Sequence, residues 1–510
     1  MDNLSGNSQE SDDSFERSLK LAFEMQNAGR TPEAEALCRV LVQLRPKDAQ
    51  LLYLLGMILH KTGREHAAIE CLSSAAQYQP QSARIFDGLG CAYNKLEDYA
   101  HAAKAFERAM ELESRSAATC YHLGNTYYKL DQIERAAALF RQAVEIDSRD
   151  SACWNNLGKC LKELNRLDDS IEVYNRALEI APDYVLAHYG RAISLLTAGR
   201  LLEGFQEYEW RQNPAKARQF SRPGWKGELA PGKTLLIHAE QGFGDAIQML
   251  RFVPMARERV GRVVLECRPE LKTLFQYSQC ADVIVPFGEP IPAFDCVVSM
   301  MSLPHFLGVT LDTIPNPVPY VRAPLCKPLS DQSGRLKVGL VWAGNPTHNQ
   351  DAVRSIRLEE LDPILRVPNV SFYSLQKSVP VRDEPCLRSK DDLIHSDQTY
   401  TDFLETASVI TQLDLVIAVD TAVAHLAGAL GKPVWTLIQH SPDWRWLMGR
   451  EDTPWYPTME LYRQAERNQW ELPVRCVAES LRRLSVSTLA NPGILPEIGP
   501  QFSNAISAAA

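Results

Sequence analysis

The amino-terminal half of this 510-residue chain repeats itself every 34 residues, and this period restricts the fold more than any other feature. Glycine recurs at this interval, each time after a leucine, and alanine recurs in the second part of each unit. The recurring residues are Gly56, Gly90, Gly124 and Gly158, and Ala34, Ala68, Ala102 and Ala136. Small residues at fixed positions let paired helices pack closely, so the period predicts an array of helix–turn–helix units.

The units match the tetratricopeptide repeat, in which small, aromatic and apolar positions recur every 34 residues. Five clear units cover residues 15–182, and a weaker sixth unit extends the array to residue 211. Such arrays form extended concave surfaces that hold protein segments. The array therefore predicts recognition of a partner or acceptor, while a spacer or a dimerisation arm remains the alternative.

Composition narrows the class of protein. A net charge of -9 argues against a nucleic-acid-binding surface. The twelve cysteines include no CxxC pair, which fits free thiols in a reducing cytosol better than disulfides or zinc sites. The first 14 residues are polar and acidic, so no signal peptide is expected, and no apolar run reaches membrane-spanning length. We expect a cytoplasmic location.

The carboxyl-terminal half alternates strands with helices after a Pro/Gly-containing linker at residues 212–232. Alternating strands and helices predict parallel sheets in two doubly wound lobes, an α/β fold that follows the α-helical array. The expected lobes are residues 233–325 and 335–485, followed by a disordered tail at 486–510. The predicted strands are residues 234–239, 262–267, 282–286 and 294–299, then 337–342, 370–375, 415–419 and 434–438.

The stretch LDLVIAVDTAVAHLAGALGK, residues 413–432, predicts a buried strand that runs directly into a helix. Asp420, Thr421 and His425 lie at this junction, and residues four apart share one face of a helix. Hydroxyl, imidazole and free N–H groups at a helix N-terminus attract anions. This arrangement suits a phosphate at the carboxyl end of a strand. The alternative is that Asp420 is an N-cap and His425 a packed core residue.

Three segments carry a resemblance to a known family: GFGD (residues 242–245), VGLVWAGNP (338–346) and VDTAVAHLAGALGKPVW (419–435). They resemble glycosyltransferase family 9, the ADP-heptose:lipopolysaccharide heptosyltransferase type. Residues 441–447, SPDWRWL, resemble the subgroup that is fused to tetratricopeptide repeats. The resemblance implies a GT-B pair of Rossmann-like lobes and a nucleotide-sugar donor, with no metal and no other cofactor. The first lobe is short for this fold, so acceptor-side details transfer poorly.

The resemblance also implies roles for individual residues. It assigns the donor phosphates to Asp420, Thr421, Ala422 and His425. A basic residue in the loop after residue 342 meets the diphosphate in the family, and here it matches Arg354, although Arg354 could instead pair with Glu359 or Glu360. Gln376 and Lys377 end the strand at 370–375 on the cleft side. Protein O-GlcNAc transferases, which share this architecture more distantly, have a similarly placed lysine on the nucleotide phosphates, and the alternative for Lys377 is a solvated lysine.

For the catalytic base, the family's aspartate matches Asp245, which follows Gly242 and Gly244 at the end of the first strand. Glycines there permit a tight turn. An N-cap for a helix that starts at residue 246 is the alternative role of Asp245, and His238 is the second candidate base. Four tryptophans, Trp435, Trp444, Trp446 and Trp455, either stack on a sugar or base or clamp the last helix.

These features together predict a metal-independent, inverting glycosyltransferase whose repeat arm binds the acceptor. Fusion to repeats suggests a protein acceptor, of which flagellin is one example that the resemblance offers, and a polysaccharide acceptor remains open. The competing hypothesis is a repeat scaffold with an inactive α/β domain. The sequence does not distinguish among ADP-, UDP- and CMP-linked sugars.

Overall fold

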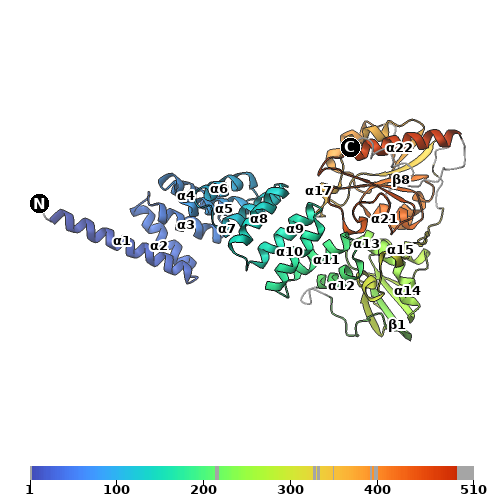
Figure 1. Ribbon diagram of the computed structural model, residues 1–510, viewed down its shortest axis with the longest axis horizontal. Coiled ribbons are helices and arrows are strands. Elements are labelled where there is room, and N and C mark those ends of the chain that lie inside the picture. Colours follow the sequence, from blue (N-terminus) through green and yellow to red (C-terminus); the bar gives the residue numbers. More distant parts are fainter. Residues whose placement is uncertain are drawn as a thin grey trace. The chain divides into compact units, whose positions relative to one another are not determined.

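The computed structural model describes residues 3–212, 218–325, 329, 334–348, 350–390, 393–395 and 400–490. The chain divides into two compact units, residues 1–191 and 192–510. The first unit holds the repeats and the second holds the α/β region (Figure 1). Among the described helices, none combines the length and the apolar character that crossing a membrane requires.

The first unit is a series of helix pairs. Its helices are α1 (Asn3–Asn27), α2 (Thr31–Leu44), α3 (Ala49–Lys61), α4 (Glu65–Tyr78), α5 (Ala83–Lys95), α6 (Tyr99–Leu112), α7 (Ala117–Lys129), α8 (Ile133–Ile146), α9 (Ser151–Glu163) and α10 (Leu167–Ile180). The recurring glycines lie where a large side chain from the second helix packs. A Cβ atom on Gly90 would lie 2.5 Å from the Phe106 ring, and one on Gly124 would lie 2.9 Å from Phe140. The tetratricopeptide architecture predicted from the period is confirmed.

The turn inside each pair repeats the same backbone conformation at the same interval. The residues with positive φ are Gly29, Gly63, Glu97, Asp131, Asn165 and Gly199. Glycine adopts this left-handed conformation without steric cost, and Asn and Asp tolerate it. Glu97, at φ 60°, is therefore the least suited residue in the series.

The sixth repeat differs from the other five because its second helix packs into the α/β core. The compact units divide within α11 (Val185–Thr197), earlier than the expected array end at residue 211. In α12 (Leu201–Tyr208), Phe205 is buried and meets Trp444 edge-on at 5.5 Å. Part of the expected linker is also packed, since Trp225 is only 1% exposed. The weaker sixth unit thus contributes to the α/β region.

The first lobe contains a four-stranded parallel sheet in the order β3-β2-β1-β4. Its strands are β1 (Ala230–His238), β2 (Val260–Cys267), β3 (Val283–Pro286) and β4 (Cys296–Ser299). Its helices are α13 (Phe243–Met249), α14 (Val253–Arg257), α15 (Pro269–Tyr277) and α16 (Leu303–Phe306). The sequence predicts one helix over 246–259. A 3₁₀ turn at residues 250–252 separates α13 from α14, and Pro254, which has no N–H to donate, lies in the first turn of α14.

The second lobe contains a six-stranded parallel sheet in the order β10-β9-β8-β5-β6-β7. Its strands are β5 (Leu336–Val341), β6 (Val370–Ser374), β7 (Leu393–His395), β8 (Leu415–Val419), β9 (Val434–Ile438) and β10 (Met459–Arg463). Its helices are α17 (Asp351–Arg354), α18 (Asp362–Leu365), α19 (Glu384–Arg388), α20 (Phe403–Ile410), α21 (Ala422–Ala429) and α22 (Glu471–Ala490). The sequence pattern predicts the inner strands but not β7 and β10, which are short or carry polar residues at the sheet edges.

The expected disordered tail begins inside the last helix. Residues 486–490 continue α22, and residues 491–510 lie outside the described part of the chain. The two lobes are Rossmann-like, as the strand and helix alternation predicts.

The two lobes pack against each other through α13 and α21. A buried arginine of the first lobe strengthens this interface. The Arg251 guanidinium donates to the backbone carbonyl oxygens of Trp455 and Pro315 and to the Tyr320 hydroxyl, the last at 2.9 Å. The bond to Trp455 crosses from the first lobe to the second, while Pro315 and Tyr320 belong to the first lobe's segment.

Candidate active site

Strand β8 ends in the turn formed by Asp420 and Thr421, and helix α21 begins directly after it. Thr421 is the N-cap residue in extended conformation, but its side chain does not cap the helix. Its hydroxyl oxygen is buried and has no hydrogen-bond partner among the described residues. Orphan N–H groups are a general property of a helix start. The turn therefore offers a hydroxyl and backbone donors to a ligand at the carboxyl end of a parallel strand.

His425 lies one turn along α21 and is packed in the interior, as the alternative interpretation expected. Its Nδ1 lies 2.9 Å from the Tyr456 hydroxyl, and its ring stacks on Trp446 at 5.2 Å. Burial, with a contribution from the Arg445 charge, lowers the pKa of His425 to about 3. The imidazole is therefore neutral near pH 7 and offers a single N–H.

Asp420 lies beside this imidazole, with its Oδ1 4.0 Å from His425 Nε2. Burial raises the pKa of the Asp420 carboxyl to about 6, and the neighbouring Asp443 carboxylate acts in the same direction. The side chain of Asp420 is only 17% exposed. A carboxyl with this pKa exists in both protonation states near neutrality, and the protonated form donates a hydrogen bond.

Asp245 lies in the first turn of α13, which begins at Phe243 rather than at residue 246. Its Oδ2 accepts a hydrogen bond from the Gly242 N–H at 2.7 Å, so the carboxylate does contribute to capping, from position N3 of the helix and not from the N-cap. Its Oδ1 is ion-paired with Arg445. Both oxygens of the candidate base are thus engaged.

The glycines of the GFGD segment have a different structural role from the one expected. The residue with positive φ in this turn is Gln241, at 66°, whereas Gly242 has φ −87°. Gly244 is needed for close approach, because a Cβ atom there would lie 2.8 Å from the His425 ring. The segment therefore brings α13 of the first lobe onto α21 of the second.

Arg445 is the residue of this site that sequence reasoning does not select. Its guanidinium pairs with Asp245, donates to Asp443 Oδ1 at 2.7 Å and to Gln248 Oε1 at 2.7 Å, and lies over the Trp444 ring. The side chain is only 8% exposed. The available signal in the sequence is the position of Arg445 between two tryptophans in SPDWRWL, which indicates a buried arginine. A buried arginine requires partners such as carboxylates.

Arg354 lies close to the Asp420 turn, and its ion pair differs from the one that the alternative interpretation expected. Its charge lowers the pKa of Asp420, which places the guanidinium within electrostatic reach of that carboxyl. Its nearest acidic partner is Asp351, at 3.4 Å, and not Glu359 or Glu360. Arg354 therefore adds positive charge beside the Asp420 turn.

Gln376 and Lys377 follow β6 but differ in their surroundings. The Gln376 amide accepts from the N–H groups of Trp342 and Ala343 and donates to the carbonyls of Ala343 and Ser378. This side chain holds the loop after β5 in place. Lys377 is exposed to solvent, as its alternative role as a solvated lysine expected.

His238, the second candidate base, is separate from the Asp245 network in its contacts. Its ring packs against Phe220 at 5.1 Å, and burial lowers its pKa. The charges around it are those of Glu240, Glu266 and two arginines. Its neighbours thus come from the first lobe and from residues 211–220 before it.

The clustered tryptophans are part of the core. Trp435, Trp444, Trp446 and Trp455 are each no more than 1% exposed. Trp435 belongs to the same core cluster as Val474, Val477 and Leu481 of α22, as expected for residues that hold the last helix. The other three belong to the core that the two lobes share.

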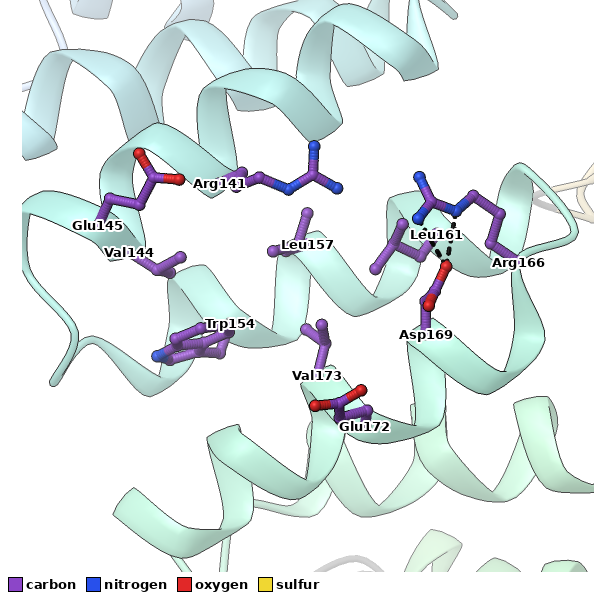
Figure 2. Close-up of a pocket in the computed structure, with 10 residues that line it drawn as sticks. All are labelled: Arg141, Val144, Glu145, Trp154, Leu157, Leu161, Arg166, Asp169, Glu172 and Val173. Atoms are coloured by element: carbon purple, nitrogen blue, oxygen red, sulfur yellow. Dashed lines mark hydrogen bonds and ion pairs between the residues drawn. The ribbon is translucent and has the colours of Figure 1, made fainter.

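A cavity of about 300 Å³ lies in the repeat array between α8, α9 and α10 (Figure 2). Apolar side chains and Trp154 line it, and charged side chains surround them. The lining residues are Arg141, Val144, Glu145, Trp154, Leu157, Leu161, Arg166, Asp169, Glu172 and Val173. The cavity is large enough to take one apolar side chain of a bound segment.

Comparison with known families supports both halves of this description. Tetratricopeptide repeat models match residues 49–82, 88–151, 121–185 and 164–215. The model of glycosyltransferase family 9 (heptosyltransferase) matches residues 399–480. This segment contains β8, the Asp420–Thr421 turn, α21 and Arg445.

A curated relative and several solved structures are similar to parts of the chain. Protein FlbA of Caulobacter vibrioides is 27% identical over 339 residues, which cover 60% of this chain and 56% of FlbA. The chain thus matches little more than half of that relative's length. YrrB, a TPR protein with an unusual peptide-binding site, is 20% identical, with a TM-score of 0.33 over 35% of this chain and 93% of YrrB. TTC0263, a thermophilic TPR protein of Thermus thermophilus, is 23% identical, with a TM-score of 0.30 over 36% of this chain and 99% of TTC0263. These TM-scores are too low to support a conclusion about function.

The chain is a tetratricopeptide-repeat protein with an α/β region of two Rossmann-like lobes. Residues 399–480 of its α/β region form a segment of the glycosyltransferase family 9 (heptosyltransferase) type.

Proposed function

We propose that the α/β region is a GT-B glycosyltransferase that moves a sugar from a nucleotide-sugar donor to an acceptor by a metal-independent, inverting displacement. The observation that carries the proposal is the Thr421 hydroxyl, which is buried, without a partner among the described residues, and located at the start of α21. An unsatisfied buried hydroxyl costs free energy unless a ligand satisfies it. Diphosphate oxygens are suitable acceptors at a helix N-terminus.

The leaving diphosphate carries negative charge, so the charges around the turn decide whether it binds. Arg354 and Arg445 supply positive charge, while Asp245, Asp420 and Asp443 oppose it. The raised pKa of Asp420 reduces this opposition, because a neutral carboxyl donates a hydrogen bond to the donor instead of repelling it. The α21 dipole adds to the attraction.

Asp245 is the proposed general base, and Arg445 positions it. Arg445 holds one Asp245 oxygen and the Gly242 N–H holds the other. With both oxygens engaged, neither is free to take a proton from an acceptor. We propose that the donor diphosphate competes for Arg445 and thereby frees Asp245 Oδ1 to accept the acceptor's proton.

The repeat array is the proposed acceptor arm. The apolar cavity beside Trp154, with charges of both signs around it, supports a protein segment as the bound acceptor or partner (Figure 2). Flagellin is one protein acceptor that the family resemblance offers. We place the reaction in the cytoplasm, whose reducing conditions suit the free cysteines of the repeats.

Nucleotide binding tests the proposed donor site. Thermal unfolding would be followed with ADP, UDP, GDP, CMP and their sugar conjugates, on wild type and on Thr421→Val. A ligand at 100 times its dissociation constant adds about 2.7 kcal/mol. We expect one nucleotide class to stabilise the wild type, and Thr421→Val to weaken its binding about tenfold, the loss of one hydrogen bond of about 1.4 kcal/mol.

Thr436→Val is the matched control. Thr436 on β9 also has a buried hydroxyl without a partner among the described residues, so the substitution removes the same group at another position. Its nucleotide affinity is expected to equal that of wild type. Equal nucleotide affinity in Thr421→Val and wild type would contradict the assignment of the phosphate site to the Thr421 turn. If no nucleotide stabilises the wild type, the alternative of a repeat scaffold with an inactive α/β domain is favoured.

A further inference from the structure

Three side chains of different chemistry converge in the repeat array, away from the proposed donor site. Asp87 and Cys91 stand four residues apart on α5, and His122 comes from α7 of the next repeat. One ligand atom from each lies within 4.8 Å of the other two. All three side chains are partly exposed, so the group is accessible to an ion from solvent.

Neighbouring contacts hold two of these side chains, Asp87 and His122. The Thr119 hydroxyl donates to Asp87 Oδ1 at 2.9 Å. The His122 ring stacks on Phe106 at 5.7 Å with an interplanar angle of 16°. A further hydrogen bond joins the same two helices, from the Asn94 amide to Thr126 Oγ1 at 2.9 Å.

We propose that Asp87, Cys91 and His122 form a binding site for one Zn²⁺ ion that links two successive repeats. Thiolate, imidazole and carboxylate are the ligand types that zinc takes, whereas magnesium and calcium prefer oxygen alone. Tetrahedral coordination requires ligand atoms about 3.3 to 3.7 Å apart, so the side chains need to close by about 1 Å. The Cys91 thiol proton leaves to solvent when the ion binds.

Three protein ligands leave a fourth position for water or a further carboxylate. The Thr119 hydroxyl donates to one oxygen of the Asp87 carboxylate, and ligating carboxylates are commonly hydrogen-bonded in this way.

In the sequence, the absence of a CxxC pair argues against a zinc site, but that test finds only ligands that lie close together in one segment. Here the ligands lie on two helices of consecutive repeats, and only the stacking of the repeats brings them together. An ion at this point joins α5 to α7 and stiffens the array.

Zinc titration of the untagged, full-length, metal-free protein tests the proposal, with a chromophoric chelator as competitor. The wild type is expected to bind one equivalent. Cys91→Ser and Asp87→Asn are expected to bind at least about 100-fold more weakly, and Thr119→Val about tenfold more weakly. Cys71→Ser is the matched control, since Cys71 is another partly buried repeat cysteine outside the group, and its affinity is expected to equal that of wild type.

Cobalt gives a second readout that does not depend on affinity. Co²⁺ bound to a thiolate shows a charge-transfer band, which is expected in wild type and Cys71→Ser and absent in Cys91→Ser. Circular dichroism of each variant checks that the helices are intact. The proposal is overturned if the wild type binds no equivalent of zinc, or if Cys91→Ser and Asp87→Asn both bind it as tightly as wild type does.

Discussion

The repeat array and the α/β region bury their side chains through contacts of very different range along the chain. In the array, Gly90 packs on Phe106 and Gly124 on Phe140, within one repeat in each case. In the α/β region, Arg445 meets Asp245 across 200 residues, and Arg251 meets Trp455 across 204. Damage to the array is therefore expected to stay local, while damage to the lobe interface affects the whole region.

The largest expected effect follows loss of a long-range contact. Arg251→Met leaves the carbonyls of Pro315 and Trp455 and the Tyr320 hydroxyl without their donor, inside the lobe interface. A buried acceptor left without its donor costs about 1 to 3 kcal/mol, so the loss of all three bonds is expected to cost about 3 to 5 kcal/mol. Calorimetry is expected to show the α/β transition shifted down and the repeat transition unchanged.

Arg257→Met is the control for that substitution. The Arg257 ion pair with Asp282 is half exposed, so its loss is expected to cost less than about 1 kcal/mol. An α/β region equally destabilised by both substitutions would contradict the role of Arg251 in the interface.

A smaller effect is expected from a large-to-small change in the array. Phe140 is buried against Gly124, and Phe140→Ala is expected to cost about 3 kcal/mol. Because each repeat contacts only its neighbours, the loss is expected in the repeat transition alone. The nucleotide affinity of Phe140→Ala is expected to equal that of wild type, because the donor site lies in the α/β region. A changed affinity would contradict the independence of the repeat array and the α/β region.

Arg251→Met and Phe140→Ala also show which contacts the sequence predicts and which it does not. The 34-residue period predicts Gly124 and its packing, because the contact lies within a repeat. The strand at 415–419 and the helix after it are predicted as well, because a continuous apolar run of that length is typical of a parallel core strand. The Asp420 turn follows from its place between the two.

The partners of those site residues depend on tertiary packing and leave no local pattern. Arg445 meets Asp245 only when the lobes dock, and α13 reaches the His425 ring through Gly244, beside the packing of that ring on Trp446 and Tyr456. The amide of Gln376 looks from the sequence like a ligand at a strand end, yet backbone groups of the neighbouring loop use it fully. The edge strands β7 and β10 are missed for a related reason, since edge positions carry a weaker apolar pattern.

Two neighbouring groups of the site are expected to respond to pH in opposite directions. The pKa of His425 is lowered in the folded state. Its contribution to the free energy of unfolding is therefore complete above about pH 6.5 and is lost as pH falls, by about 2 kcal/mol at pH 5. The pKa of Asp420 is raised, so its contribution is present below about pH 4 and is lost as pH rises through 6. It therefore opposes the His425 effect by about 1 kcal/mol between pH 7.5 and 5.

Urea unfolding at pH 7.5 and pH 5 measures both contributions. Relative to wild type, His425→Gln is expected to lose less stability on acidification, and Asp420→Asn is expected to lose more. The same pH dependence in all three proteins would show that neither group has the folded-state pKa described above.

The smallest expected effect is a gain in the array. Glu97 occupies the turn position where the other repeats have glycine, aspartate or asparagine, and its φ is 60°. Glu97→Gly relieves this left-handed conformation at some cost in chain entropy, and we expect about 0.5 to 1 kcal/mol of stabilisation. Asn165→Gly is the control and is expected to gain less, because asparagine tolerates the conformation. Thermal unfolding of the repeat transition measures both.

The location of donor binding tests the central claim most directly. Hydrogen exchange followed by mass spectrometry would be measured with and without the nucleotide that stabilises the protein. We predict protection of the segments at residues 242–248 and 419–426, from the two lobes together, with no change in α1 to α10. Protection confined to the repeats, or to one lobe without the Asp420–Thr421 turn, would contradict a nucleotide-sugar site at the lobe interface.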